Sequence, residues 1–252
     1  GDLWCWGGPR QSARPERVPG PAGEVASLVA GGDFACALLA DGAVRCWGGN
    51  DQHQLGSAGA PAGAVVVKGL ARARAIAAGA THACALDDAG SVLCWGANYQ
   101  GQLGVLPQEE YPKPGPPTAV AALRGATAIG CGGCNSCAST STEVRCWGCN
   151  DAGQLGSGRL SQRAAPEAVV GLGAVAQLEA GRELTCARDL AGAVSCWGDG
   201  ALTPIPWHGL EAAVDLAVGD FGACVVTRAG TVYCGRPGIP PEEPGITDAV
   251  DV

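Results

Sequence analysis

Residues 78–104 read AGATHACALDDAGSVLCWGANYQGQLG, and this stretch decides the fold. Two short apolar runs, His82–Leu86 and Ser91–Trp95, flank the turn cluster Asp87–Gly90. Runs of strand length on either side of a turn that contains Gly and Asp are typical of a β-hairpin. A third run of small apolar residues, Ala75–Ala78, precedes them and is closed by a glycine. A helix would need apolar residues at i, i+3 and i+4 over many positions without glycine, and the stretch lacks this pattern.

The stretch belongs to a repeat that covers the chain. The tripeptide Cys-Trp-Gly recurs at intervals of 41, 48, 52 and 50 residues, and a copy without the tryptophan follows after another 38. An outer strand, such as Ala64–Val67 or Ala168–Val170, precedes each unit, so that one period holds the four strands of a β-propeller blade. We therefore expect an all-β propeller of six or seven four-stranded blades, with the ring incomplete in this chain. The copies lie at Cys5-Trp6-Gly7, Cys46-Trp47-Gly48, Cys94-Trp95-Gly96, Cys146-Trp147-Gly148, Cys196-Trp197-Gly198 and Cys234-Gly235.

The repeat assigns residues 1–252 to a single propeller domain. The last residues, Ile246–Val252, resemble the start of an inner strand at Glu211–Leu216, and the first seven residues resemble the end of a unit. Because the chain begins at Gly1 and contains no Met, we expect a processed chain or part of a longer one. The expected blades are a split blade of 1–7 with 236–252 and complete blades of about 8–48, 49–96, 97–148, 149–198 and 199–235.

Composition narrows the classes of function. The 252 residues carry a net charge of −8, with 16 Lys and Arg against 24 Asp and Glu. Binding to nucleic-acid phosphates needs clustered cations, so we expect no nucleic-acid partner. The sequence has no apolar run long enough for a transmembrane helix, so we expect no membrane-spanning segment. Lysine occurs only at Lys68 and Lys113 in a chain rich in Ala, Arg and Gly, a usage that suits a bacterial origin.

The repeat resembles a known family. The strings Ala-Gly-x-x-His-x-Cys-Ala-Leu and Asp-Gly-x-Val-x-Cys-Trp-Gly-x-Asn-x-x-Gly-Gln-Leu-Gly are similar to repeats of the regulator of chromosome condensation family. The best copies are Asn50–Gly56, Ala78–Gly104 and Asn150–Gly156. The resemblance implies a seven-bladed propeller with a binding role, because this fold carries many binding functions. The fifth unit departs from the pattern, since no Asn-x-x-Gly-Gln-Leu-Gly follows Trp197-Gly198.

Ten cysteines pair at an offset of nine or ten residues across the hairpin turns. Residues equidistant from such a turn face each other, and a non-hydrogen-bonded pair brings Cβ atoms close enough for a disulfide. Buried free thiols are the alternative, which the recurrence disfavours. Disulfides persist in oxidising compartments, so we expect an exported protein that is extracellular, periplasmic or at the cell surface. The expected bridges are Cys36–Cys46, Cys84–Cys94, Cys137–Cys146, Cys186–Cys196 and Cys224–Cys234.

Four further cysteines have no partner at this offset. The partner of Cys5 would lie upstream of Gly1. Cys131, Cys134 and Cys149 lie within one unit, and their two-residue spacings resemble a thiolate metal site. We expect instead a further disulfide, for example Cys131 or Cys134 with Cys149, with a metal site or a free thiol as alternatives.

Neither catalysis nor a cofactor is indicated. The histidines His53, His82 and His208 lie in no nucleophile or metal motif, so we expect no catalytic residues, no cofactor and no enzymatic activity. The recurring Asn and Asp after Cys-Trp-Gly offer calcium ligands, but turn formation explains them better. The tryptophans of Cys-Trp-Gly share one blade position and are expected to pack between blades. Trp207 lies outside this register, and we expect it to be exposed.

One set of loops offers a binding surface. A glycine lies five residues before each paired cysteine, at Gly31, Gly79, Gly132, Gly181 and Gly219, and the residues after it vary. Equivalent loops of a propeller gather on one face around the axis, where variation on a rigid frame creates a specific surface. The structural alternative is that the phenylalanines turn inward. We expect one contiguous exposed patch formed by Asp33, Phe34, Thr81, His82, Asn135, Arg182, Glu183, Asp220 and Phe221.

Together these features predict an exported, non-enzymatic, monomeric propeller that binds an unidentified protein partner through loops on one face. The alternative is a regulator that promotes guanine-nucleotide exchange on a small GTPase, a function that the resemblance implies for the founding family member. The disulfide pattern and the acidic charge argue against this alternative, because such a regulator works in the cytosol or nucleus.

Overall fold

A computed structural model describes residues 3–7, 12–18, 23–57, 63–106, 116–121, 123–220, 222–236 and 238–239. All regular structure in this part of the chain is β-strand. Among these residues there is no helix of the length and apolarity needed to cross a bilayer.

Five antiparallel sheets follow one another along the chain, and we number them blades 1 to 5. A separate two-stranded sheet of β1 (Trp4–Gly7) and β2 (Ser12–Arg17) precedes them. Blade 1 contains β3 (Val25–Ala30), β4 (Phe34–Leu39), β5 (Val44–Gly48) and β6 (Val65–Val66). Blade 2 contains β7 (Ala73–Ala78), β8 (His82–Asp87), β9 (Val92–Gly96) and β10 (Thr118–Ala119). Blade 3 contains β11 (Ala128–Cys131), β12 (Asn135–Ser139), β13 (Val144–Asn150) and β14 (Ser161–Ala168). Blade 4 contains β15 (Gln177–Ala180), β16 (Leu184–Arg188), β17 (Val194–Gly198) and β18 (Ala201–Pro206), and blade 5 contains β19 (Ala213–Val218), β20 (Ala223–Thr227) and β21 (Val232–Gly235).

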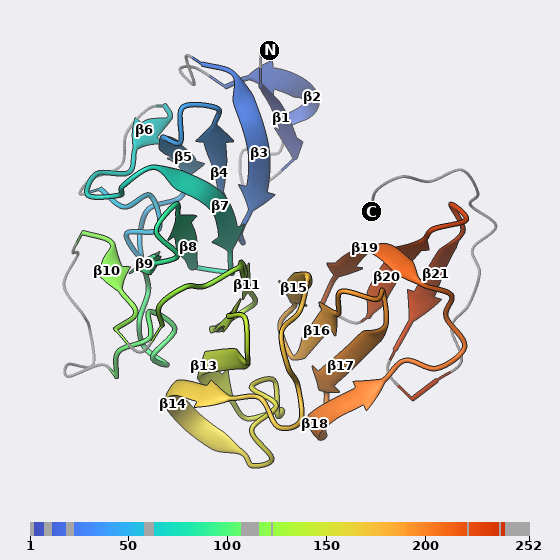
Figure 1. The fold of residues 1–252 in the computed structure, drawn as a ribbon. Coiled ribbons are helices and arrows are strands. Elements are labelled where there is room, and N and C mark those ends of the chain that lie inside the picture. The colour runs from blue at the N-terminus through green and yellow to red at the C-terminus, as the bar shows by residue number, and fades with distance from the viewer. Residues whose placement is uncertain are drawn as a thin grey trace.

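The blades are arranged around a common axis, as the prediction of an all-β propeller requires. Figure 1 shows β3, β7, β11, β15 and β19 nearest the axis, with the later strands of each blade farther out. Each strand pairs with the next one along the chain, so that a blade is built from successive antiparallel neighbours. The loops between the first and second strands therefore lie at the axis.

The fourth, outermost strand of a blade belongs to the blade whose strands precede it in the sequence, and the predicted blade limits are wrong on this point. The expected limits grouped it with the strands that follow it, whereas its hydrogen bonds join it to the Cys-Trp-Gly strand before it. In blade 1, Val66 lies opposite Arg45, and Val65 lies opposite Cys46. The chain turns back beside the strand that it has just left, which gives an antiparallel pair without a crossover. Of the expected split blade, residues 240–252 lie outside the described residues.

A tryptophan of one blade is hydrogen-bonded to the loop between the third and fourth strands of the previous blade. The indole N–H of Trp95 donates to the backbone carbonyl of Gln54 at 2.9 Å. Trp147 and Trp197 donate in the same way to Gln102 and Gln154. These three indoles are at most 1% exposed, which confirms packing between blades for Trp95, Trp147 and Trp197, whereas Trp47 is half-buried and Trp6 is 67% exposed. We call this arrangement the Trp–Gln latch.

An asparagine side chain stabilises the fold of each loop that carries a latch glutamine. The side-chain oxygen of Asn50 accepts the backbone N–H of Leu55, and its amide donates to the carbonyl of Ser57. Asn98 and Asn150 make equivalent bonds. These asparagines therefore form turns, and Leu55 is held fully buried against blade 2.

The five predicted cross-strand disulfides are confirmed. Each joins cysteines directly opposed on the second and third strands of a blade, with Cα–Cα distances of 4.0–4.1 Å. A sixth bridge, Cys134–Cys149, resolves the choice that the sequence left open. Cys131 keeps a buried free thiol, and Cys5 is free and exposed.

The expectation that Trp207 is exposed is wrong. Its side chain is 5% exposed and packs in the core between blades 4 and 5. The backbone N–H of Trp207 donates to the carbonyl of Val194, just as Val67, Val120 and Val169 donate in blades 1 to 3. Trp207 thus occupies a regular repeat position at which the other blades carry valine.

Candidate functional site: the axial loops

Five loops close the blades at the axis, each running from a glycine to the residue three positions later. In blade 1 the backbone N–H of Gly31 donates to the carbonyl of Phe34 at 2.8 Å, and the other four loops repeat this bond. We call these segments the axial loops: 31–34, 79–82, 132–135, 181–184 and 219–222.

Backbone hydrogen bonds join the axial loops of blades 1 to 4 to their neighbours. Gly32 donates to the carbonyl of Ala80, Ala80 donates to Gly132, and Gly133 donates to Gly181, at distances of 3.0–3.2 Å. In blades 1 to 4 this close approach requires the first glycine of the loop. A Cβ atom on Gly132 would lie 2.0 Å from the carbonyl oxygen of Gly181. Glycine therefore allows neighbouring loops to form one rigid backbone frame.

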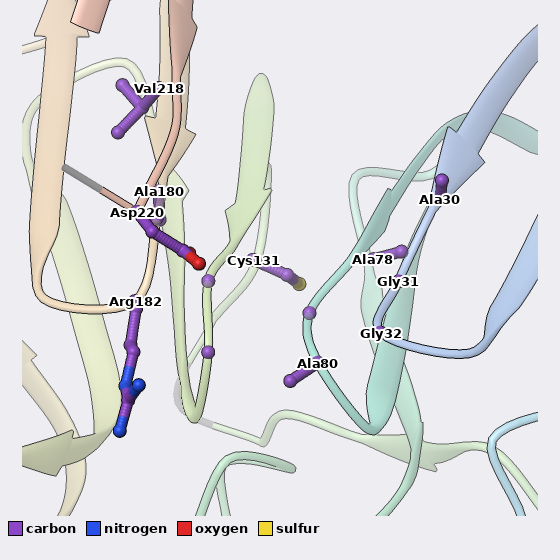
Figure 2. Close-up of a pocket in the computed structure, with 14 residues that line it drawn as sticks. Ala30, Gly31, Gly32, Ala78, Ala80, Cys131, Ala180, Arg182, Val218 and Asp220 are labelled. Atoms are coloured by element: carbon purple, nitrogen blue, oxygen red, sulfur yellow. The ribbon is translucent and has the colours of Figure 1, made fainter. Parts of the chain in front are cut away.

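A cavity of about 310 Å³ lies between the axial loops. Glycines and alanines from blades 1 to 4 and Val218 of blade 5 line it, and Arg182 and Asp220 are its charged residues (Figure 2). The lining confirms that these loops gather around one axis. The surface around the cavity carries the exposed side chains of Asp33, Arg182, Glu183 and Asp220, and Thr81 is half-buried there. Three carboxylates against one guanidinium give this surface an acidic balance.

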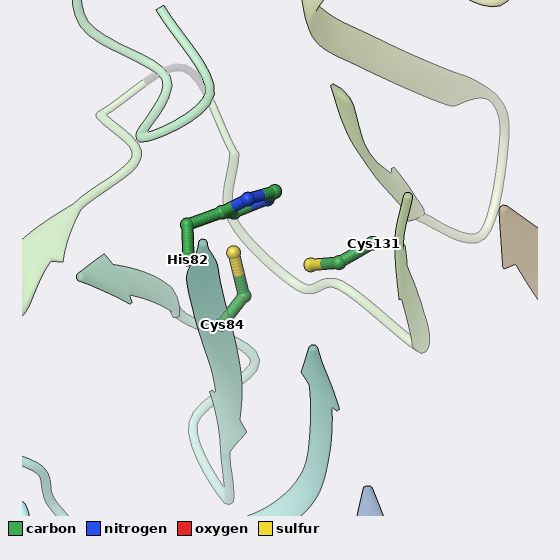
Figure 3. A group of neighbouring side chains, drawn as sticks. All are labelled: His82, Cys84 and Cys131. Carbon is green, nitrogen blue, oxygen red and sulfur yellow. The ribbon is translucent and has the colours of Figure 1, made fainter. Parts of the chain in front are cut away.

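Below the loops of blades 2 and 3 lies a buried polar cluster (Figure 3). His82 Nε2 and Ser136 Oγ are 2.8 Å apart, and the Cys131 thiol donates to the same hydroxyl at 3.7 Å. Ser136 in turn donates to the carbonyl of Gln102. Desolvation lowers the pKa of His82 to about 4 against the opposing effect of a hydrogen bond to the backbone of Asn135, and desolvation raises the pKa of Cys131 to about 12. At neutral pH both groups are uncharged, as burial without a charged partner requires.

The cluster does not form the metal site that the cysteine spacing suggested. The ligand atoms of His82, Cys84 and Cys131 lie within 4.8 Å of one another. The sulfur of Cys84, however, is bonded to Cys94, and the predicted alternative set loses Cys134 and Cys149 to their own disulfide. Cys131 then remains as a single protonated thiol with a hydroxyl partner.

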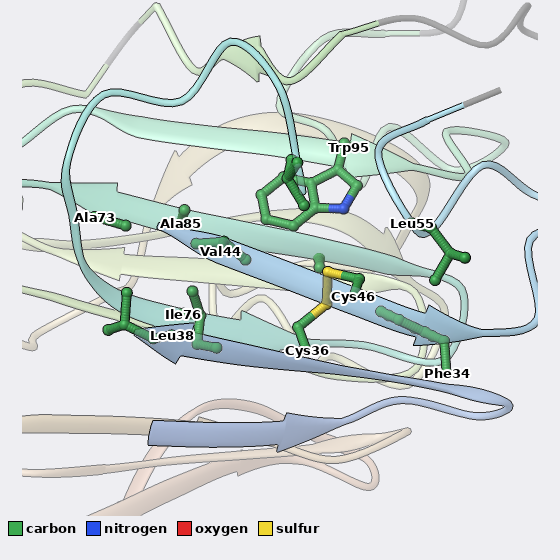
Figure 4. Packing of buried hydrophobic residues seen from close by; sticks show 12 residues of the cluster. Phe34, Cys36, Leu38, Val44, Cys46, Leu55, Ala73, Ile76, Ala85 and Trp95 are labelled. Atoms are coloured by element: carbon green, nitrogen blue, oxygen red, sulfur yellow. A yellow bond between two sulfur atoms is a disulfide. The ribbon is translucent and has the colours of Figure 1, made fainter. Parts of the chain in front are cut away.

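Three residues of the predicted binding patch are buried, which corrects their expected exposure. Phe34 is 4% exposed, and His82 and Asn135 are fully buried. Each is the fourth residue of its axial loop and begins the second strand of a blade, so its side chain turns back beneath the glycine. A Cβ on Gly31 would lie 2.1 Å from the ring of Phe34, whose place in the blade 1 core is seen in Figure 4. Phe221 lies outside the described residues.

The patch residues that remain at the surface, Asp33, Thr81, Arg182, Glu183 and Asp220, are second or third residues of their loops. The third residue of a loop also lies beside the residue that follows Cys-Trp-Gly in the same blade. The backbone N–H of the residue after Cys-Trp-Gly donates to the carbonyl of the third loop residue. The pairs are Asp33 with Gly49, Thr81 with Ala97, Cys134 with Cys149 and Glu183 with Asp199. Sequence reasoning missed this second row of residues, although the constant spacing between the two motifs marks it.

Comparison with known proteins identifies the repeat. Two family models, both described as the regulator of chromosome condensation (RCC1) repeat, match residues 25–54 and 73–102 and residues 89–139 and 143–188. Together these matches cover more than half of the chain. Sequence comparison with curated proteins finds no significant relative.

Solved structures share the fold at low sequence identity. Prp20p from Saccharomyces cerevisiae, studied for its binding to Gsp1p and histones, is 20% identical, with a TM-score of 0.76 over 88% of this chain and 62% of its own. Human WBSCR16 is 22% identical, with a TM-score of 0.76 over 93% of this chain and 67% of its own. The ectodomain of the Arabidopsis thaliana receptor kinase ACR4 is 21% identical, with a TM-score of 0.54 over 89% of this chain and 68% of its own. This chain spans about three fifths of the yeast protein.

Proposed function

We propose that this chain, which belongs to the regulator of chromosome condensation repeat family, is an exported, non-enzymatic propeller that binds a protein partner through its axial loops. The observation that carries the proposal is the construction of this face. A backbone frame of hydrogen-bonded glycine loops presents exposed side chains that differ from blade to blade. A rigid scaffold with variable loops is a common way to build a specific binding surface.

The chemistry of the face favours a protein partner. The exposed residues carry both signs of charge with carboxylates in excess, which disfavours nucleic acid and suits a protein whose charges are complementary, with an acidic group opposite Arg182. With Phe34 buried, the binding residues that remain from the predicted patch are Asp33, Thr81, Arg182, Glu183 and Asp220. Similar propellers include one studied for binding to Gsp1p and histones, which shows that the fold can serve protein recognition.

Six disulfides support export. They form and persist in oxidising compartments, and five of them recur at one blade position. The similarity to a receptor-kinase ectodomain places this fold outside a cell in at least one protein. Mass mapping of the protein isolated from its native source, with thiols blocked during lysis, should find these six bridges oxidised. Free thiols at the five cross-strand pairs would contradict export.

Matched charge reversals test the binding face. Arg182→Glu alters an axial side chain that is 73% exposed, and Arg228→Glu makes the same change at the exposed turn on the opposite end of blade 5. A partner captured by the wild-type protein should bind Arg182→Glu at least tenfold more weakly and bind Arg228→Glu unchanged. Equal affinity for both variants would remove the axial face from the proposal.

Guanine-nucleotide exchange on a small GTPase is the second candidate, and it rests on family membership. A nucleotide-release assay with the captured partner distinguishes the two. The exchange function requires a GTP-binding partner whose nucleotide release is accelerated by the propeller. An exported partner without bound nucleotide would exclude the exchange function and support the exported binding propeller.

A further inference from the structure

We propose that the Cys134–Cys149 disulfide is a thiol-exchange site on the axial face, at which small thiols and dithiols of the surroundings reversibly open the axial loop of blade 3. The proposal concerns regulation of the binding face and so rests on the proposed function. Its chemistry can nevertheless be tested without any partner.

This disulfide lies outside the repeat pattern. Five bridges join opposed residues of neighbouring strands, and in four of them both cysteines are at most 1% exposed. Cys134 instead sits at the third position of an axial loop, where the other blades place Asp33, Thr81 and Glu183. Cys134 is half-buried whereas Cys149 is 4% exposed, so Cys134 is the more accessible half of the bridge. Exposed disulfides are the ones that exchange readily.

The fold does not need this bridge. In blades 1, 2 and 4 the third loop residue is held to the residue after Cys-Trp-Gly by a backbone hydrogen bond alone. Blade 3 makes the same bond, from the N–H of Cys149 to the carbonyl of Cys134 at 3.1 Å. The bridge also encloses Cys137–Cys146, which already closes most of the same loop. Opening it therefore frees few residues.

The surroundings of the bridge favour one direction of attack. The side-chain amide of Gln154 donates to the sulfur of Cys149 at 3.5 Å. A donor at this sulfur stabilises negative charge there, which makes Cys149 the better leaving group. A thiolate of the reagent attacks Cys134 Sγ, the bond to Cys149 breaks, and Cys149 leaves as a thiolate that then takes up a proton.

With a dithiol the exchange goes to completion. The second thiol of the reagent attacks the reagent's own sulfur in the mixed disulfide, and Cys134 is released as a thiol. The dithiol is oxidised to a cyclic disulfide, and its two electrons reduce the protein bridge to two thiols. The reverse reaction, with a small disulfide as oxidant, restores the bridge.

Partial reduction of the folded protein tests the proposal. The protein is treated with limiting dithiothreitol, alkylated, digested and mapped, and amide hydrogen exchange is followed in parallel. We expect Cys134 and Cys149 to be labelled before any cysteine of the four fully buried pairs. We also expect exchange to rise at residues 132–135 and 149 while the rest of the propeller stays protected. Reduction of the half-buried Cys224–Cys234 pair should leave the exchange of the blade 3 loop unchanged.

A matched variant separates chemistry from folding. Cys134→Thr combined with Cys149→Ala reproduces the Thr81 and Ala97 pair of blade 2, and it should fold and lose the fast-labelled thiols. Release of Cys134 and Cys149 no sooner than the four buried pairs would overturn the proposal, as would unfolding of the double variant. If labelling succeeds while Arg182→Glu leaves partner binding intact, the exchange site stands and the proposed binding face fails.

Discussion

The first three blade junctions are built differently from the fourth. Between blades 1 and 2, 2 and 3, and 3 and 4, a Trp–Gln latch joins the loop between the third and fourth strands of one blade to the third strand of the next. Blade 4 has no Gln-containing loop at this place, and in blade 5 Gly235 pairs with Ala223 at the position where blades 1 to 4 have tryptophan. The chain has thus lost both halves of the latch at one junction, which indicates that loop and tryptophan act as a single unit.

Trp207 fills the space at the fourth junction. It stands where the other junctions carry Val67, Val120 and Val169, and it packs with Leu184 of blade 4 and Leu216 of blade 5. Its indole N–H finds no hydrogen-bond partner among the described residues, unlike those of the latch tryptophans. Burial of a large ring therefore replaces a hydrogen-bonded contact, and the junction keeps its apolar core but loses the bond between loop and blade.

Removal of a latch should have the largest effect. Trp147→Ala deletes a fully buried indole and its bond to Gln102, so we expect the free energy of unfolding in urea to fall by about 3–5 kcal/mol. Trp6→Ala serves as control, because Trp6 is 67% exposed and should change stability by less than about 0.5 kcal/mol. Equal losses in the two variants would mean that the latch has no special role.

Exchanging residues between the two kinds of junction sharpens the comparison. Trp207→Val installs the residue of the other junctions, yet it should cost about 2–4 kcal/mol because it leaves a cavity where no latch exists. Val169→Trp should cost about 1–3 kcal/mol, because the space beside it already holds Trp197. Urea titration of both variants checks this, and a stabilised Trp207→Val would show that Trp207 does not replace the latch.

The axial frame should be the next most sensitive feature. Gly132→Ala drives a methyl group against the carbonyl of Gly181, so we expect a loss of about 1–3 kcal/mol and faster amide exchange in the neighbouring loops. Gly173→Ala is the matched control, because a methyl group there meets nothing within 4 Å. Comparable melting temperatures for the two variants would argue against a close-packed frame.

The smallest effect should appear in the pH dependence of the junction between blades 2 and 3. Burial lowers the pKa of His82 to about 4 from 6.5, so the unfolded chain takes up the proton first as the pH falls. The stability that neutral His82 provides is complete above pH 6.5 and is lost as the pH falls toward 4. Relative to His82→Asn, the wild-type protein should lose up to about 1.4 kcal/mol per pH unit in this range.

Glu179 does not disturb that comparison. Desolvation raises the pKa of Glu179 to about 7 from 4.5. The stability that protonated Glu179 provides is therefore complete below pH 4.5 and is lost as the pH rises through 7, opposite to that of His82. It is present in both proteins and cancels in their difference. A difference that stays constant from pH 7 to 4 would mean that His82 is not held neutral.

The sequence predicted those features that repeat. The propeller, the five cross-strand disulfides and the gathering of glycine loops at the axis follow from spacing, because equal spacing places equivalent residues at equal positions. The burial of Phe34 and Asn135 could not be predicted from spacing. A variable residue beside a glycine is consistent with either exposure or packing, and only the backbone path beneath the glycine decides between them.

Departures from the repeat were harder to interpret. The sequence places Trp207 outside the register because its equivalents in blades 1 to 3 are valines, and the equivalence is visible only in the shared backbone bond to the third strand. Cys149 had two candidate partners in the sequence, and the position of Cys134 in the axial loop selects one of them. The outer strands β6 and β10 have two residues each and lie nearer in sequence to the next blade than to the strand with which they pair, so the sequence pattern did not show which neighbour they join.

The central claim is that the axial loops bind the partner, and amide hydrogen exchange of the propeller with and without its captured partner tests it most directly. The account predicts that the partner protects residues 31–34, 79–82, 132–135, 181–184 and 219–222 and leaves the outer strands β6, β10, β14 and β18 unchanged. Protection confined to those outer strands, with the axial loops exchanging at the same rate in both states, would contradict it.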